Sequence, residues 1–86
     1  MIDSSPTVLV VDDEVQILRF LRPALESEGY RVVEAQTGRE ALVQASTRAP
    51  DVIVLDLGLP DIDGLEVLSR LREWCAAPVI ILSARG

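Results

Sequence analysis

The chain has 86 residues and a net charge of -6 at pH 7, and it contains neither lysine nor histidine. Its length limits it to one small domain with a modest core. Its eight basic residues are all arginines and form no basic stripe, so direct nucleic-acid binding by this segment is not expected. The single cysteine, Cys75, excludes an internal disulfide and a Cys/His metal cluster.

The sequence indicates neither an export signal nor a membrane span. Residues 1–6 lack a basic region followed by an apolar one, so they do not have the form of a signal peptide. No apolar run approaches the roughly 20 residues that cross a bilayer. The lone cysteine is typical of a reducing compartment, and we expect a cytoplasmic protein with no membrane contact.

The first part of the chain predicts a strand followed by a helix. Residues 7–11 form a β-branched, apolar run, and the next three residues are acidic. A helix is expected from about Val15 to Glu28, with Gly29 as its C-terminal cap. Pro23 lies inside this helix and removes one backbone donor, so a bend is expected there. The apolar face has spacings of three and four and comprises Ile17, Leu18, Leu21, Ala24 and Leu25.

Two further helices separate three further strands. The remaining elements are expected to be a strand at 31–35, a helix at 37–47, a strand at 51–56, a helix at 63–75 and a strand at 78–83. Thr37 and Glu40 have the spacing of a capping box. Asp63 is expected to cap the last helix, and Asp61 to be a solvated turn residue. The inner faces are expected to comprise Ala41, Leu42 and Ala45 in one helix, and Leu65, Leu68 and Leu71, extended by Val67, in the other.

The alternation of strands and helices predicts the fold class. A β-α-β-α-β-α-β order implies right-handed crossovers and a parallel sheet with helices on both faces, which is a doubly wound α/β fold. The unbroken apolar run at 52–55 supports this, because a strand covered on both faces has no polar side.

Three carboxylates fall at strand ends in this order. Asp12 and Asp13 follow the first strand, and Asp56 ends the third. In a parallel sheet these ends share one edge, and if the two strands are neighbours, their spacing of about 4.8 Å brings the carboxylates close together. Like charges that close repel unless a cation lies between them, and Mg²⁺ binds through one or two carboxylates with water and phosphate. Ser83, at the end of the fourth strand, adds a hydroxyl, and the set suits phosphoryl transfer to an aspartate.

Each of these residues alone has a simpler interpretation. A single aspartate after a strand is usually a turn residue or a helix cap, and a single serine is usually structural. Trp74 and Cys75 are interpreted as packing residues. The conjunction of carboxylates at successive strand ends is what favours a functional site.

The sequence as a whole resembles the receiver domain of two-component response regulators. The matching stretches are V-L-V-V-D-D-E, D-V-I-V-L-D-L-G-L-P-D-I-D-G and P-V-I-I-L-S-A-R, and they cover essentially the whole chain. The L-G-L-P turn after Asp56, with R-F-L-R-P-A-L-E and L-S-A-R, is similar to potassium-responsive Kdp-type regulators of the winged-helix class. The resemblance implies a flavodoxin-like sheet with strand order 2-1-3-4 for the part present.

The resemblance also implies roles for particular residues. Asp56 would accept phosphate from a sensor histidine kinase, and Ser83 would be the switch hydroxyl. Mg²⁺ would be held by Asp12, Asp13, Asp56 and the backbone carbonyl of Gly58. Pro60 and Gly64 would shape the loop after Asp56. The module would be a signalling domain rather than an enzyme, and its full-length parent would control dimerisation and transcription.

The chain departs from the family pattern after the fourth strand. Residues 1–86 are expected to be a partial receiver domain, without the fifth strand, the last helix, the lysine after that strand or a DNA-binding domain. An uncovered fourth strand would be an exposed apolar edge, so self-association is expected.

Other classes fit the sequence less well. An inert fragment that keeps the acidic pocket without activity remains an alternative because the family lysine is absent. An aspartyl-nucleophile phosphotransferase of the haloacid-dehalogenase kind needs D-x-D after the first strand, and here the two aspartates are adjacent. No glycine-rich phosphate loop follows any strand, so nucleotide binding is not indicated. A calcium loop aligned on Gly64 would place Leu59 and Arg70 at ligand positions.

Overall fold

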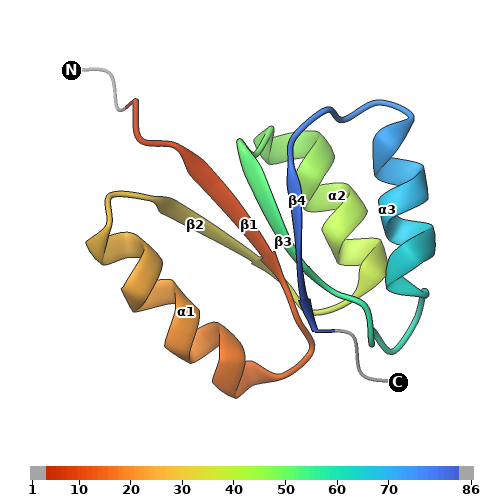
Figure 1. The fold of residues 1–86 in the computed structure, drawn as a ribbon, viewed down its shortest axis with the longest axis horizontal. Helices are drawn as coiled ribbons and strands as arrows, with labels where there is room; N and C mark the ends of the chain where they lie inside the picture. The colour runs from red at the N-terminus through yellow and green to blue at the C-terminus, as the bar shows by residue number, and fades with distance from the viewer. Residues whose placement is uncertain (1–3, 84–86) are drawn as a thin grey trace.

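The computed structural model describes residues 4–83, and within them strands and helices alternate as the sequence predicts (Figure 1). All seven elements of this part of the chain agree with expectation to within about three residues at each end, the usual uncertainty of helix and strand boundaries. Their bounds are β1 Thr7–Val11, α1 Val15–Ser27, β2 Arg31–Ala35, α2 Gly38–Arg48, β3 Val52–Asp56, α3 Gly64–Arg72 and β4 Val79–Ser83.

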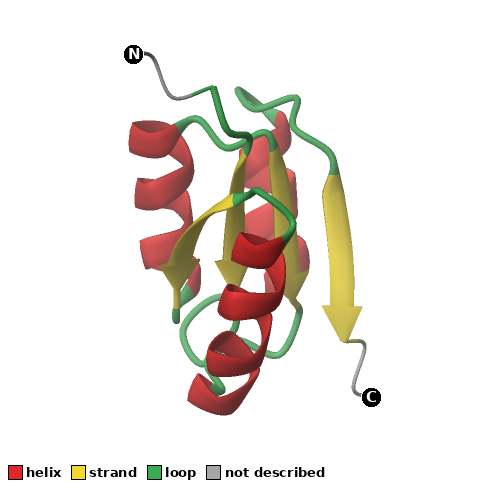
Figure 2. Ribbon diagram, turned by 90° about the vertical axis from the view of Figure 1, so that its left-hand side faces the viewer, coloured by secondary structure: helices red, strands yellow, loops and turns green. Residues whose placement is uncertain are grey.

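The strands form one parallel sheet in the order β2-β1-β3-β4, as predicted. All their arrowheads point the same way in Figure 2. The chain moves outward from β1 to β2 and then crosses back to place β3 on the other side of β1. The carboxyl ends of β1 and β3 therefore flank the point where the winding reverses, which is where open α/β sheets bind ligands.

Two apolar clusters cover the two faces of the sheet. One lies beneath α2 and α3 and includes Leu9, Ile53 and Leu55, all fully buried. The other lies beneath α1 and joins Val8 and Val10 to Leu18 and its neighbours. Figure 1 shows α1 on one side of the sheet and α2 with α3 on the other. Residues one apart on a strand point to opposite faces, so a fully apolar strand feeds both clusters.

The buried face of α3 agrees with the predicted one except at Leu65. Val67 and Leu71 are fully buried and Leu68 is partly buried, but Leu65 is 59% exposed. The helix begins at Gly64, which is itself buried, and positions three, four and seven residues further on share its face. Leu65 falls off this stripe, so its assignment to the inner face was wrong.

In α1, four of the five predicted inner residues are buried or half-buried, and one is not. Leu18 is buried, and Leu21 and Leu25 pack against the same cluster. Ala24 is exposed and was wrongly assigned. The helix continues through Pro23, as expected, and ends before Gly29, which has φ 91°. The bend expected at Pro23 stays a prediction.

The capping prediction for α2 is confirmed in its main part. The Thr37 hydroxyl accepts a hydrogen bond from the Glu40 N–H at 3.0 Å. The Glu40 carboxylate reaches back one residue further than a standard capping box and accepts from the Gln36 N–H at 3.0 Å. One of the first amide groups of the helix, that of Glu40, is thus satisfied by its own cap, and the amide just before the cap is satisfied by Glu40.

Candidate metal centre

The backbone of the sheet fixes the position of two aspartates at its carboxyl edge. Asp12 follows β1 directly, and its N–H donates to the Ala35 carbonyl at 3.0 Å, which extends the β1–β2 ladder by one step. Asp56 is the last residue of β3, and the pairing of Val11 with Leu55 places the two aspartates side by side across the β1–β3 ladder. Their location follows from strand register and needs no long side-chain reach.

The carboxylates of Asp12, Asp13 and Asp56 form one cluster, as the strand-end argument predicts. Each offers an oxygen that lies within 4.8 Å of those of the other two. Asp12 is 3% exposed and Asp56 is 1% exposed, whereas Asp13 is open to solvent. The cluster is therefore a buried pair with a third carboxylate at its mouth.

Local hydrogen bonds orient the two buried carboxylates. Asp12 Oδ1 accepts from the Glu14 N–H at 2.8 Å, and Asp56 Oδ1 accepts from the Gly58 N–H at 3.1 Å. Both are bonds from an aspartate to the amide two residues further on, a turn that aspartate favours because of its short side chain.

Burial raises the pKa of Asp12 above its usual value, because the charged form loses hydration. The Glu14 N–H acts in the other direction, and the negative charges of Asp56, Glu14 and Asp13 raise this pKa further. A group of ionised carboxylates in this position is costly to the folded chain and attractive to a cation.

The donor set of the cluster fits a hard divalent cation. All its potential ligand atoms are carboxylate oxygens, and they follow or end two neighbouring strands. Asp13 is exposed to solvent, so the cluster is accessible from that side. Mg²⁺ prefers oxygen ligands and keeps several waters, so a site with a few carboxylates and an open face suits it. Asp12, Asp13 and Asp56 would hold such an ion.

The loop after Asp56 is tightly folded. The Gly64 N–H donates to the Leu57 carbonyl at 3.2 Å. A Cβ at Gly64 would lie 2.5 Å from Leu57 Cα, so only glycine allows the loop ends to approach this closely. Gly58 and Pro60 are exposed within this loop, and Gly58 is two residues after Asp56.

Ser83 lies at the carboxyl end of the fourth strand, as the sequence predicts. It is the last residue of β4, and its backbone pairs with Asp56. The pairing is shifted by one residue between Leu55 and Asp56, an irregularity that often re-aims side chains next to a site. The Ser83 side chain lies outside the described part of the structure.

Asp61 has a contact that the sequence did not reveal. It was predicted to be a solvated turn residue, and its side chain is exposed. Its two oxygens nevertheless accept from the N–H groups of Gly38, at 2.7 Å, and Arg39, at 3.0 Å. These two bonds lower the pKa of Asp61, and the bond from the Arg39 N–H has the larger effect. Asp61 thus caps α2 from a loop more than twenty residues away, and a sequence scan of the α2 cap finds only Thr37.

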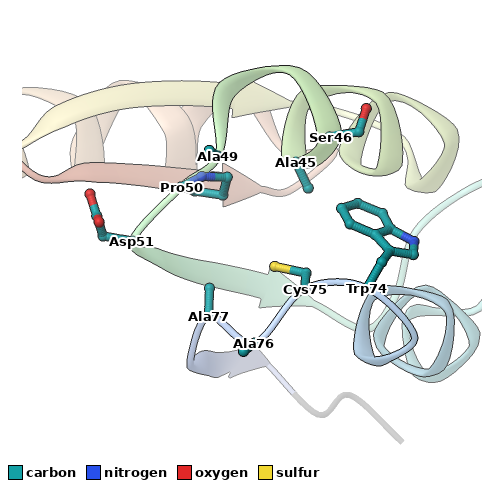
Figure 3. A pocket seen from close by; sticks show the side chains of 9 residues that line it. All are labelled: Ala45, Ser46, Ala49, Pro50, Asp51, Trp74, Cys75, Ala76 and Ala77. Carbon is teal, nitrogen blue, oxygen red and sulfur yellow. The ribbon is translucent and has the colours of Figure 1, made fainter.

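A groove lies at the other end of the sheet. It runs beside Trp74 and Cys75 to Asp51, which precedes β3, so the length of that strand separates it from Asp56 (Figure 3). Cys75 packs against the core as predicted, whereas Trp74 is 51% exposed and packs only in part. The Asp51 carboxylate accepts from the Thr7 N–H at 2.7 Å, which ties the starts of β1 and β3 together. This groove lacks the carboxylate cluster, which lies at the opposite end of β3.

Fold and site together define a flavodoxin-like α/β domain with a cluster of carboxylates at its topological switch point. The chain belongs to the response regulator receiver domain family, which matches residues 8–86.

Named relatives agree with the Kdp-type resemblance. The KDP operon transcriptional regulatory protein KdpE of Escherichia coli (strain K12) is 60% identical over 79 residues, which are 92% of this chain and 35% of that protein. KdpE of Mycobacterium tuberculosis (strain CDC 1551 / Oshkosh) is 59% identical over 91% of this chain and 34% of its own length. The chain thus spans about a third of the length of these transcriptional regulators.

A solved structure of a complex also matches. It is the crystal structure of histidine kinase ThkA with response regulator protein TrrA, with a TM-score of 0.86 and 38% identity over 94% of this chain and 71% of the matched one.

Within residues 4–83, none of the helices has the length and apolarity that a membrane crossing requires.

Proposed function

We propose that the chain is a phospho-accepting receiver module of a two-component system, with Asp56 as the acceptor. The observation that supports this most is the clustering of the Asp12, Asp13 and Asp56 oxygens within 4.8 Å at the switch point of the sheet. Asp56 is almost fully buried and ends a strand at the edge where open α/β sheets bind ligands, and a buried carboxylate in such a place favours a functional role.

In the proposed reaction, an oxygen of the Asp56 carboxylate attacks the phosphorus of a phosphohistidine on a sensor kinase. The P–N bond breaks as the new P–O bond forms, and the imidazole nitrogen keeps the electron pair. Bound Mg²⁺ would neutralise charge on the phosphoryl oxygens. The chain's own part is to hold Asp56 through the β3 ladder and the Gly58 N–H, and to supply Asp12, Asp13 and the Gly58 carbonyl as ligands.

Ser83 is proposed as the switch hydroxyl. Its backbone is paired with that of Asp56, which places the end of β4 next to the proposed acceptor. In the proposal, phosphorylation at the sheet edge is thereby communicated to β4.

Two comparisons support a sensor kinase as partner and a transcriptional regulator as the full-length protein. The kinase–regulator complex that matches this chain contains a histidine kinase beside its regulator. The KdpE relatives are transcriptional regulators about three times as long as this segment. We propose that a sensor histidine kinase is the phosphodonor, and that the segment serves a cytoplasmic regulator whose transcription control lies outside residues 1–86.

Two alternatives predict different outcomes for the same experiment. An inert domain that keeps the acidic pocket would gain no phosphate, because no lysine of this chain can pair with the phosphoryl group. An aspartyl phosphotransferase would pass phosphate to a small acceptor and turn over repeatedly. A receiver gains one phosphate and holds it until hydrolysis.

The test is to incubate the chain with Mg²⁺ and a small acyl-phosphate donor and to record the intact mass. One added phosphoryl group is expected in the wild type, and none in Asp56→Asn or when a chelator removes Mg²⁺. The matched control is Asp51→Asn, which changes an aspartate at the opposite edge of the sheet and should leave the added mass unchanged. Equal labelling of wild type and Asp56→Asn would contradict the proposal.

We also propose that β4 is a self-association edge. It is the outer strand of the sheet next to β3, and Ile80, Ile81 and Leu82 are 56%, 41% and 39% exposed. An apolar edge strand with unpaired backbone groups on one side is a template for a second chain. A concentration series by light scattering should show association, and a monomer at every concentration would count against it.

A further inference from the structure

Two long-range hydrogen bonds join the loop that follows Asp56 to the start of α2. The Asp61 carboxylate accepts from the Gly38 N–H at 2.7 Å and the Arg39 N–H at 3.0 Å. These amides begin α2, where the first N–H groups have no partner within the helix. The carboxylate therefore satisfies two backbone donors with a negative charge at the positive end of the helix.

The approach of the loop to α2 depends on the absence of a side chain at Gly38. A Cβ there would lie 2.9 Å from Val67 Cγ2, 3.0 Å from Ile62 Cβ and 3.3 Å from Asp61 Oδ1. Ile62 also packs against the core beneath α2 and α3. The contact thus combines two hydrogen bonds that Asp61 accepts with close packing from Ile62, and the two residues are adjacent in the loop.

The same loop is closed at its base. The Gly64 N–H donates to the Leu57 carbonyl, and the two residues are too close for any side chain at Gly64. Between this closure and the Asp61 tie lie only Gly58, Leu59 and Pro60. The short stretch that includes Gly58 is therefore held at both ends, although Gly58 itself is exposed and has no side chain to anchor it.

We propose that Asp61 is a positioning residue for the phospho-acceptor loop, which sets the Gly58 backbone beside Asp56 by tying the loop to the start of α2. The inference rests on the proposed function, because it assigns Gly58 a place in the metal site. Asp61 touches neither a metal nor a phosphoryl group, and it acts through the loop. Groups that orient metal ligands from outside commonly change metal affinity about 10–100-fold.

The variant Asp61→Ala removes both acceptors, and Asp61→Asn keeps one acceptor oxygen. Amide hydrogen exchange by NMR is measured on the metal-free chain, and Mg²⁺ affinity by chemical-shift titration with Mg²⁺ alone. Asp61→Ala should lose protection at Gly38 and Arg39, and also at Gly58, and should bind Mg²⁺ at least about fivefold more weakly. Asp61→Asn should have amide protection and Mg²⁺ affinity between those of the wild type and Asp61→Ala, because it can still accept one of the two hydrogen bonds.

The matched control is Asp51→Ala, which removes another exposed aspartate that accepts from a distant backbone N–H. It should lower the free energy of unfolding without changing Gly58 exchange or Mg²⁺ affinity. The inference is overturned if Asp61→Ala frees Gly38 and Arg39 but leaves the Gly58 amide and Mg²⁺ affinity at wild-type values. A wild type that binds no Mg²⁺ would instead contradict the proposed function, and the Gly58 amide would still decide whether Asp61 positions the loop.

Discussion

Asp12→Asn is expected to stabilise the metal-free chain at pH 7. The substitution keeps the shape of the side chain and the Oδ1 acceptor for the Glu14 N–H, and it removes one negative charge from the cluster with Asp13 and Asp56. Asn can also donate to a neighbouring carboxylate, so no new unsatisfied group is created.

The magnitude follows from the spacing of the charges. Two unit charges 4.8 Å apart repel by about 0.9 kcal/mol in water and by about 3.5 kcal/mol at an effective dielectric constant of about 20. Asp12 and Asp56 are both buried, so their repulsion lies toward the larger value, whereas Asp13 is exposed and screened. A gain of about 1–3 kcal/mol in the free energy of unfolding is expected, and each 1 kcal/mol raises Tm by about 4–8 °C in a domain of this size.

The sign of the pH dependence is fixed by the raised pKa of Asp12. The folded chain binds this proton more tightly than the unfolded chain, so stability falls as pH rises from the usual aspartate pKa through the raised one. Below both pKa values the carboxyl is neutral in both states, and the advantage of Asp12→Asn should disappear.

The assay is urea unfolding followed by circular dichroism, in a chelator and across a pH series. Asp51→Asn is the control, since it removes an exposed aspartate at the other edge of the sheet and should not stabilise. Mg²⁺ should stabilise the wild type and have less effect on Asp12→Asn. An Asp12→Asn variant that is no more stable than wild type at pH 7, with the wild-type pH dependence, would refute the electrostatic reasoning.

Four substitutions test other parts of the structure. Gly64→Ala should cost about 1–3 kcal/mol in urea unfolding, because its Cβ would lie 2.5 Å from Leu57 Cα, and a neutral result would contradict the loop geometry. Leu71→Ala should cost about 2–5 kcal/mol and Leu65→Ala less than about 1 kcal/mol, so equal losses would contradict the observed face of α3. Ile80→Lys should shift light scattering toward the monomer, and unchanged association would exclude this edge.

The order of elements and the carboxylate cluster could both be predicted from the sequence for the same reason. Apolar runs of strand length are bounded by acidic residues, glycines and prolines, and a parallel sheet brings the carboxyl ends of its strands to one edge. Asp12 and Asp56 are neighbours because their strands are neighbours, so no side-chain detail was needed to bring them together. The strand order itself came from the family resemblance.

What the sequence could not supply depends on three-dimensional context. The inner face of α3 was misjudged at Leu65 because leucine spacing alone does not decide which side of the helix faces the sheet, and the burial of Gly64, Val67 and Leu71 leaves Leu65 outside. Asp61 was missed because its partners, Gly38 and Arg39, are 23 and 22 residues away. An aspartate in a turn has many local uses, and only the fold brings the start of α2 to it.

The central claim is that Asp56 is the phospho-acceptor, and locating the phosphate tests it most directly. After treatment with Mg²⁺ and a small acyl-phosphate donor, borohydride reduction converts an aspartyl phosphate to homoserine, and peptide mass mapping shows which aspartate has changed. Conversion at Asp56 alone, with Asp12 and Asp13 unmodified, is the predicted result. Conversion at Asp12 or Asp13, or a phosphate on a hydroxyl that borohydride does not reduce, would contradict it.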